Sequence, residues 1–401
     1  MKACGLVVEY NPFHYGHQYH LKQAKEKTNA DCVIAVISGN FLQRGEPAIM
    51  DKYSRAKAAI LGGVDLVIEL PYVYAVQYSD YFAKGAIDIL YHSGVNSICF
   101  GSESGNINSF SDAYLLKKQH HDQYEAHVKT YLNEGYAYPD AATKAYQSIF
   151  GISSILDVSK PNNILGLSYV QAIKDSQYPI KPITIKRIQN NYHDTAITGN
   201  IASATSIRKE VLKNPSASET AAETMPATTL DILKSYKYEA GCWHDWELYF
   251  PFLKYRVETM TLTELQQIEG IIEGLEHRIV RTASEASSFQ EWMTALKTKR
   301  YTWTRLQRIF VHILTNTKKE ENMLANNIGY MRVLAMNKTG QAYLNQQKKQ
   351  TELPFITKIN QIQHPFLQTE ERAAKAYYSV LPGSKHRKFF LQEIKSPIII
   401  K

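Results

Sequence analysis

The sequence of 401 residues has no uninterrupted apolar run long enough to cross a bilayer, so we expect no transmembrane helix and no membrane partner. Its opening residues, Met1 to Val8, lack the apolar region of a signal peptide. Cysteines are few, and Cys4, Cys32, Cys99 and Cys242 do not stand at the spacing of a metal site. These absences predict a reduced, cytoplasmic protein with no cysteine-ligated metal.

Acidic residues are scarce towards the carboxyl end. From Lys297 onward the chain has nineteen Lys and Arg residues against six Asp and Glu, whereas the preceding part has 27 against 32. The net charge of +8 therefore hides a mildly acidic first part and a strongly basic second part. This split predicts a catalytic part joined to a part that binds a polyanion. The alternative is that the charged residues serve only solubility, but solubility alone would not concentrate positive residues in one part of the chain.

Short apolar runs alternate with amphipathic stretches over the first 190 residues. The runs predict strands at 4–8, 32–38, 66–70, 97–100 and 183–188, and helical spacing predicts helices at 19–27, 52–61, 80–92 and from 109 onward. This alternation predicts an α/β fold with a Rossmann-like parallel sheet and helices on both faces. Ligands of such sheets bind beyond the carboxyl ends of the strands.

The stretch EYNPFHYGH, from Glu9 to His17, lies between the first predicted strand and its helix. Amides at a helix start bind phosphate, and Gly16 lets a base or ribose approach the backbone. His14 and His17 can then donate hydrogen bonds to charge that develops on an α-phosphate. Two surface histidines, or a zinc pair, are the alternatives, and zinc is disfavoured because no further ligand stands at metal spacing.

Polar loops follow the later strands. Residues 38–48 hold Asn40, Gln43, Arg44 and Glu46, and residues 100–105 form a small-residue loop. The arginine fork suits phosphate or a carboxylate, although an exposed polar connection would explain each residue alone.

Three more segments carry candidate phosphate or adenine contacts. Asn162 or Asn163 could cap the helix that begins near Pro161 or could reach adenine, and Arg187 ends the last predicted strand before a polar run at 190–194. Hydroxyls at 203–206 followed by Arg208 would grip a triphosphate at a helix start, although a plain Ser/Thr cap is the alternative.

A Ser-, Ala- and Thr-rich stretch at 213–229 predicts a linker or mobile loop, which divides the chain into a catalytic domain at 1–212 and a mainly helical, basic domain at 230–401. In the second domain, cations alternate with aromatics from 297 to 308, and Tyr330–Gln341 is again basic. Such a surface suits phosphates and stacked bases, and a charged helix face packed by its aromatics is the alternative. The candidate RNA-binding residues are Arg300, Arg305, Arg308, Arg332 and Lys338.

Taken together, EYNPFHYGH, SGNFLQRGEPA at 38–48, PNN at 161–163 and YMRVLAMNKTGQ at 330–341 resemble one family over nearly the whole chain. The first stretch matches the HxGH signature of the nucleotidylyltransferase superfamily, and SATSIR at 203–208 resembles its second signature. More narrowly, the chain resembles the bacterial tRNA(Met) cytidine acetate ligase family.

The resemblance implies that ATP activates acetate as acetyl-adenylate with release of pyrophosphate. The acetyl group then passes to the wobble cytidine of elongator tRNA(Met), giving N4-acetylcytidine. Mg²⁺ is expected with ATP, although no carboxylate cage is visible. Alternatives are a small-molecule adenylyltransferase or carboxylate–amine ligase of the same superfamily, or an RNA-binding protein with a vestigial nucleotide site. The oligomeric state stays open.

The resemblance also assigns residue roles. His14, His17, Ser206 and Arg208 would be catalytic, with Ser206 and Arg208 on the departing pyrophosphate, and Gly101, Asn162 and Arg187 would contact ATP. One departure is Ala204, which replaces the second serine of the signature. The implied ATP-binding segment consists of Val7, Val8, Glu9, Tyr10, Asn11, Pro12, Phe13, His14, Tyr15, Gly16, His17, Gln18, Tyr19 and His20.

Overall fold

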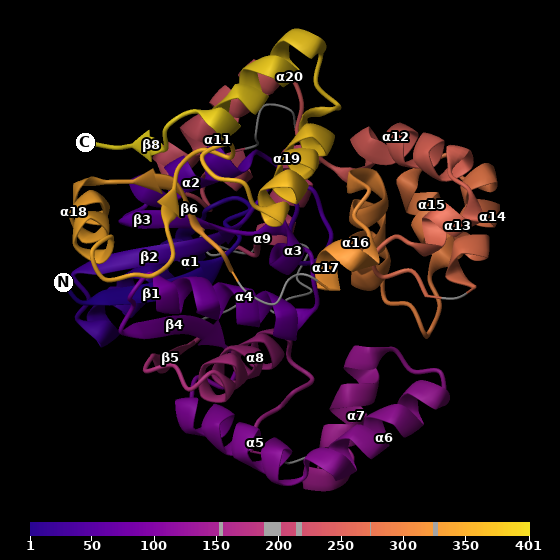
Figure 1. Cartoon of the computed structure of the whole chain (residues 1–401), viewed down its shortest axis with the longest axis horizontal. Helices are drawn as coiled ribbons and strands as arrows, with labels where there is room; N and C mark the ends of the chain where they lie inside the picture. Colours follow the sequence, from indigo (N-terminus) through magenta and orange to yellow (C-terminus); the bar gives the residue numbers. More distant parts are fainter. Residues whose placement is uncertain (152–154, 188–201, 214–218, 273, 324–327) are drawn as a thin grey trace.

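An eight-stranded sheet organises the chain (Figure 1). The computed structural model describes residues 1–151, 155–187, 202–213, 219–272, 274–323 and 328–401. The strand order is β5-β4-β1-β2-β3-β6-β7, with β8 also paired to β6. The strands are β1 (Ala3–Val8), β2 (Cys32–Ser38), β3 (Leu66–Leu70), β4 (Ser97–Ser102), β5 (Lys181–Lys186), β6 (Met331–Met336), β7 (Phe355–Ile356) and β8 (Ile398–Ile399).

The first five strands are parallel, as the continuous apolar runs predict, because both faces of such a sheet are covered. β2 is buried along its whole length. The register pairs Val8 with Ile37 and Ser38 with Leu70, so the carboxyl ends of neighbouring strands lie together. The predicted α/β class is confirmed. The strand predicted at 183–188 corresponds to β5, and residue 188 lies outside the described part.

Helices cover both faces of the sheet. α1 packs on β1, β4 and β5, α2 packs on β2, β3 and β6, and α4 and α8 pack together (Figure 1). α6 and α7 form a hairpin that projects beyond the sheet. The helices of this part are α1 (Tyr15–Thr28), α2 (Lys52–Leu61), α3 (Tyr72–Ala75), α4 (Ser79–His92), α5 (Ile107–Gln119), α6 (His121–Asn133), α7 (Tyr138–Phe150), α8 (Pro161–Asp175) and α9 (Ala204–Lys213).

The later chain is mainly helical, as predicted. α12, α14, α15 and α16 pack together around aromatic side chains, and none of the described helices combines the length and hydrophobicity of a membrane span. Its helices are α10 (Glu219–Ala222), α11 (Ala227–Ala240), α12 (Trp246–Thr259), α13 (Leu262–Gln266), α14 (Leu275–Glu285), α15 (Phe289–Leu296), α16 (Trp303–Thr315), α17 (Lys319–Met323), α18 (Lys338–Gln347), α19 (Pro365–Tyr378), α20 (Gly383–Phe390) and the 3₁₀ turn Leu391–Ile394.

The boundary between the two predicted domains needs a correction. β6 joins the first sheet antiparallel to β3, and β7 and β8 pair with the two ends of β6. α11 packs on α2, and α18 packs on β2. Part of the predicted linker, 219–229, is also structured, and its residues 214–218 lie outside the described part. The prediction assigned 230–401 to a separate domain because local sequence patterns do not show that β6 returns to the sheet.

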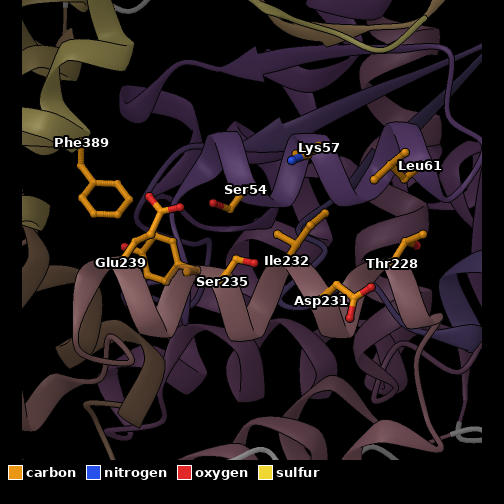
Figure 2. A pocket seen from close by; sticks show the side chains of 10 residues that line it. Ser54, Lys57, Leu61, Thr228, Asp231, Ile232, Ser235, Glu239 and Phe389 are labelled. Atoms are coloured by element: carbon orange, nitrogen blue, oxygen red, sulfur yellow. The ribbon is translucent and has the colours of Figure 1, made fainter.

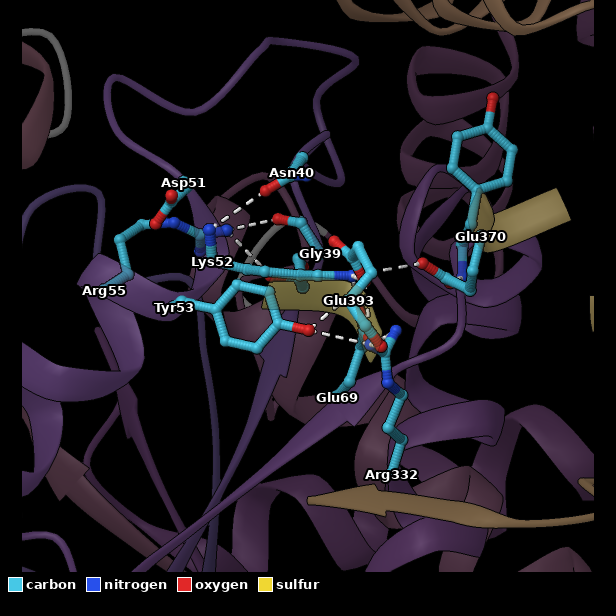
Figure 3. Close-up of polar contacts among 12 residues, drawn as sticks. Gly39, Asn40, Asp51, Lys52, Tyr53, Arg55, Glu69, Arg332, Glu370 and Glu393 are labelled. Atoms are coloured by element: carbon cyan, nitrogen blue, oxygen red, sulfur yellow. Dashed lines mark hydrogen bonds and ion pairs between the residues drawn. The ribbon is translucent and has the colours of Figure 1, made fainter. Parts of the chain in front are cut away.

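A buried ion cluster, formed by Lys52, Glu69, Arg332, Glu370 and Glu393, fastens the returning segment (Figure 3). Lys52 Nζ lies 2.6 Å from Glu69 and 3.0 Å from Glu393. Arg332 lies 3.0 Å from Glu69 and 2.7 Å from Glu393. The Arg332 side chain is fully buried, so its predicted role in RNA binding is wrong.

Candidate functional site

A pocket of about 310 Å³ opens at the carboxyl ends of β1, β4 and β5 and is called the strand-end pocket below. β1 and β4 are neighbours where the strand order reverses direction, and ligands of open α/β sheets bind at this switch point. The sequence-predicted residues that line it are Val7, Val8, Glu9, His14, Gly16, His17, Tyr19, His20, Gly101, Asn162, Arg187 and Arg208.

Other residues of the predicted ATP-binding segment do not line the pocket, namely Tyr10, Asn11, Pro12, Phe13, Tyr15 and Gln18. Tyr10 and Phe13 belong to the hydrophobic core, and Gln18 is exposed. Helical periodicity explains Gln18, because successive residues of α1 point to different sides. Tyr10 and Phe13 instead pack against each other beneath the turn, with ring centroids 4.8 Å apart.

His14 and His17 form a reciprocal cap at the start of α1. The Gly16 amide donates to His14 Nδ1 at 3.0 Å, and the His14 amide donates to His17 Nδ1 at 3.3 Å. Since both Nδ1 atoms accept, each neutral ring carries its proton on Nε2. The two rings lie 3.8 Å apart between centroids. The cap therefore leaves two Nε2–H donors for a ligand.

Both rings are neutral in the ligand-free protein. Burial, with smaller contributions from the positive charges of Arg187 and Arg208, lowers the pKa of His14 to about 3. Burial also lowers the pKa of His17, and the neighbouring His14, His20 and Arg187 add to this shift. A bound anion would oppose the contribution of the cations, because its negative charge favours the protonated imidazole.

Neighbouring backbone and side chains hold the turn rigidly. The Asn11 side-chain oxygen accepts a hydrogen bond from the Ile49 amide at 2.8 Å. Arg55, buried on α2, donates to the carbonyls of Glu9 (2.6 Å), Ser38 (3.0 Å) and Gly39. Arg55 thus ties the carboxyl ends of β1 and β2 together. The sequence analysis missed this residue, because a helix that also carries Lys52 and Lys57 does not mark one cation as buried.

The lining of the strand-end pocket has more positive than negative charge. Arg208 donates to the Asn11 carbonyl at 3.1 Å and forms a 3.0 Å ion pair with Glu46. Lys186, Arg187 and Arg44 are further cations of the lining, and Glu9 and Glu46 are its carboxylates. Since burial lowers the pKa of Arg44, an anion in the pocket would relieve an unfavourable environment. The residues present therefore fit a polyphosphate.

Asn162 and Asn163 have different tasks. Asn162 lines the pocket, and its side-chain oxygen accepts a hydrogen bond from Arg187 at 3.3 Å. Asn163 is buried and accepts from the Glu103 and Ser104 amides at 3.1 Å each. Glu103, which the sequence did not single out, accepts from the Asn162 side chain at 2.7 Å and from the Asn163 amide at 2.9 Å. Asn163 and Glu103 thus fix the loop after β4.

The predicted phosphate grip at 203–208 is only partly in place. Ser203, Ala204, Thr205 and Arg208 line the pocket, but Ser206 does not. Ser206 is buried, its hydroxyl donates to the Ser203 carbonyl at 2.8 Å, and its amide donates to Ser203 Oγ at 3.1 Å. Ser203 therefore caps the start of α9, and Ser206 is its hydrogen-bond partner there. The polar run at 190–194 lies outside the described residues.

The pocket also has an apolar wall that the sequence did not reveal. Phe82, Phe100, Leu165 and Tyr169 come from α4, β4 and α8 and are brought together only by the fold. A flat apolar wall beside a cationic end suits a base at one side and phosphates at the other. His20 lies in this lining as well, and its Nε2 is buried without a hydrogen-bond partner among the described residues.

Of the remaining candidate RNA-binding residues, three arginines lie at or just before α16 and Lys338 lies elsewhere. Arg300 is exposed, Arg305 lies over the Tyr301 ring at 5.2 Å, and Arg308 donates to the Gln43 carbonyl at 3.4 Å. Lys338 is exposed at the start of α18, which lies across the sheet from α16 (Figure 1). The structure therefore does not bring Lys338 together with the three arginines.

A second hollow, of about 290 Å³, lies between α2, α11 and α20 (Figure 2). Its lining holds Lys57 together with Asp231 and Glu239, beside apolar groups such as Ile232 and Phe389. This mixed lining has no cationic cluster for phosphate. Within the described residues, no group of three or more His, Cys, Asp or Glu side chains could hold a metal ion.

Comparison with known proteins agrees with this geometry. Residues 1–392 match the HIGH Nucleotidyl Transferase family. The chain is 55% identical over 400 residues to the tRNA(Met) cytidine acetate ligase of Oceanobacillus iheyensis, with 100% of both chains covered. It is 47% identical over 399 residues to the Bacillus subtilis protein of the same name, covering 98% of this chain and 96% of that one.

Two solved structures of Thermotoga maritima TmcAL have the same fold over the full length of both chains. The apo form aligns with a TM-score of 0.92 and the form bound to alpha-thio ATP with 0.89, each at 31% identity.

Proposed function

The chain belongs to the HIGH nucleotidyl transferase family, and from this premise we propose that it is an ATP-dependent tRNA(Met) cytidine acetate ligase. The observation that carries the proposal is the strand-end pocket, in which a histidine pair, an excess of cations and an apolar wall meet. Full-length relatives with this name support the same function. A substrate tRNA would place the reaction in the cytoplasm.

The first step joins acetate to AMP. An acetate oxygen attacks the α-phosphorus of ATP, the bond to the bridging oxygen breaks, and pyrophosphate leaves with the bonding electrons. Such a step needs positioning and charge neutralisation more than a base. The His14 and His17 Nε2–H groups would donate to the α-phosphate oxygens, and Arg208 would bind the departing pyrophosphate.

The second step transfers the acetyl group. The exocyclic amine of the cytidine attacks the acetyl carbonyl, the bond to the AMP oxygen breaks, and the amine loses a proton. AMP leaves as a stable anion in the cationic pocket. No protein nucleophile is required, and burial raises the pKa of Cys4, Cys32 and Cys99, so these thiols are poorly suited to act as one.

The donor set does not fit a metal held by the protein. Of the two carboxylates that line the pocket, Glu9 accepts from the Gln43 amide at 3.0 Å and Glu46 pairs with Arg208. Mg²⁺ commonly binds through nucleotide phosphates and water, with few protein ligands. Neither step above therefore passes through a protein-bound metal.

The test is to incubate the protein with ATP, acetate and unmodified elongator tRNA(Met), followed by nucleoside analysis of the RNA. We expect N4-acetylcytidine, together with AMP and pyrophosphate, and no product when acetate or ATP is omitted. AMP formation without acetylated RNA would favour a small-molecule ligase. RNA binding without any ATP consumption would favour a vestigial nucleotide site.

A further inference from the structure

Three tyrosines stand exposed beside the strand-end pocket and contribute nothing to the proposed chemistry. Tyr78, Tyr81 and Tyr138 are 42%, 38% and 44% exposed. The rings of Tyr78 and Tyr81 lie 5.1 Å apart between centroids. Burial raises the pKa of the Tyr78 phenol, and the proximity of Tyr81, Asp80 and Tyr138 raises it further, which places all three tyrosines in one neighbourhood.

This tyrosine cluster is continuous with the pocket. Tyr78 precedes α4, and Phe82, one helical turn later, belongs to the apolar wall. The Gln77 carbonyl accepts a hydrogen bond at 2.9 Å from the side chain of Gln43, which also lines the pocket. A ligand that lay on the tyrosines could therefore reach the pocket without leaving the surface.

Cations border the cluster where the α6–α7 hairpin meets the segment before α16. Lys299 lies 3.7 Å from the centroid of the Tyr136 ring, and Lys144 lies 4.8 Å from the same ring. Arg300 follows in sequence and is exposed. These residues come from the two parts of the chain that Figure 1 shows at the bottom and at the right. Basic groups therefore stand at Tyr136, two residues before Tyr138 in the chain.

The acidic groups near Tyr78 already have partners. Asp80 accepts a hydrogen bond from the Ser168 hydroxyl at 2.6 Å. Glu269 accepts one from the Gln77 side chain at 3.5 Å. Both partners are neutral groups, and the proximity of Asp80 and Glu269 adds to the burial that raises the pKa of the Tyr78 phenol, so the aromatic rings rather than positive charge define the surface at Tyr78.

We propose that Tyr78, Tyr81 and Tyr138 form a platform on which unpaired bases of an RNA loop stack while one cytidine of that loop enters the strand-end pocket. The inference rests on the proposed function and names the part of the substrate that this face binds. Aromatic rings stack on bases of any identity, and the cations neutralise the backbone phosphates. Bases inside a duplex are already stacked, so the platform requires a single-stranded loop.

The experiment compares Tyr78→Leu, Tyr81→Leu, Tyr138→Leu and the triple variant with wild type. The probes are an unmodified elongator tRNA(Met) transcript, a hairpin carrying only its anticodon loop, and a blunt duplex without a loop. Loss of one stacked base should raise the Kd for the two loop-containing RNAs about 5- to 100-fold, and Tyr→Phe variants should restore it. Tyr255→Leu is the matched control, because Tyr255 is 69% exposed on the distant helix α12.

Two measurements distinguish failure of the tyrosine platform from failure of the proposed ligase function. Acetate-dependent exchange of pyrophosphate into ATP is measured without RNA, and in the leucine variants it should equal that of wild type. The platform is overturned, and the proposed function kept, if the triple variant acetylates and binds the transcript as wild type does. It is also overturned if duplex and loop affinities fall equally. A wild-type protein that binds none of the RNAs would overturn both, and one that binds RNA without exchange would overturn the ligase alone.

Discussion

The strand-end pocket and the ion cluster contain the same types of charged side chain, but these side chains have different roles in the two places. In the ion cluster, Arg332 and Lys52 are buried and face carboxylates at 2.6 to 3.0 Å. In the pocket, cations outnumber carboxylates and face a cavity of about 310 Å³. Burial and partners, rather than residue type, decide whether an arginine stabilises the fold or binds an anion.

The ion cluster has two cations and three carboxyl groups, and protonation of Glu370 reduces the excess of negative charge. Burial, together with the neighbouring Glu69, raises the pKa of the Glu370 carboxyl well above its usual value. The nearby cations, Lys52 first, hold the pKa of Glu69 low despite burial. Lys52 and Arg332 then lie between Glu69, whose pKa is held low, and Glu393. The pocket has no such balance until an anion binds.

The largest effect is expected inside the ion cluster. Arg332→Met leaves Lys52 alone against the carboxylates, and the free energy of unfolding should fall by about 3–5 kcal/mol because a buried charge loses its partner. Denaturant unfolding measures this change. Arg300→Met, at an exposed position, should change it by about 0.5 kcal/mol or less. Equal losses of unfolding free energy in the two variants would show that the buried arginine stabilises the fold no more than the exposed one.

In the pocket, His17→Ala should impair chemistry rather than folding. Loss of one preorganised donor should lower acetate-dependent AMP formation about 10²- to 10³-fold. Affinity for tRNA should stay nearly unchanged, because His17 lies in the ATP site. His277→Ala serves as the control, since that side chain is 66% exposed on α14. Full activity of His17→Ala would remove the histidine pair from the mechanism.

A smaller effect is expected on the basic surface. Replacing Arg300, Arg305 and Arg308 with alanine should weaken tRNA binding and reduce the slope of log K against log salt by about 0.7–0.9 for each phosphate that the variant no longer neutralises. Binding titrations at several salt concentrations measure the slope. Lys338→Ala is the comparison, because Lys338 lies across the sheet. An equal change in that variant would extend the RNA surface to both sides.

The smallest effect is expected for Glu370→Gln, which replaces a carboxyl that is already neutral in the folded protein. At pH 5 the free energy of unfolding should change by about 1 kcal/mol or less. A raised folded-state pKa means that wild-type stability declines as the pH rises above about 4.5, and the glutamine variant should lack this decline. Unfolding at pH 5 to 8 tests the sign. A steeper decline in the variant would mean that Glu370 is ionised.

The sequence predicted β1 to β3 well because each is a largely apolar run that needs no distant partner to be recognised, whereas β5, which begins and ends with lysine, was predicted two residues too far along the chain. It missed β6 because Arg332 made that segment look like a basic surface, and only Glu69 and Glu393, far away in sequence, explain a buried arginine there. The histidine turn was visible as a contiguous motif. The apolar wall, Arg55 and the tyrosine platform were not, because their residues meet only after the strands and helices pack.

The return of β6 to β3 has a consequence for synthesis on the ribosome. The outer edge of β3 stays unpaired until Met336 has been translated, and an exposed edge strand is a site of aggregation. Pairing across so long a stretch of chain is also slow. The nascent protein should therefore keep the edge of β3 exposed until β6 has left the exit tunnel.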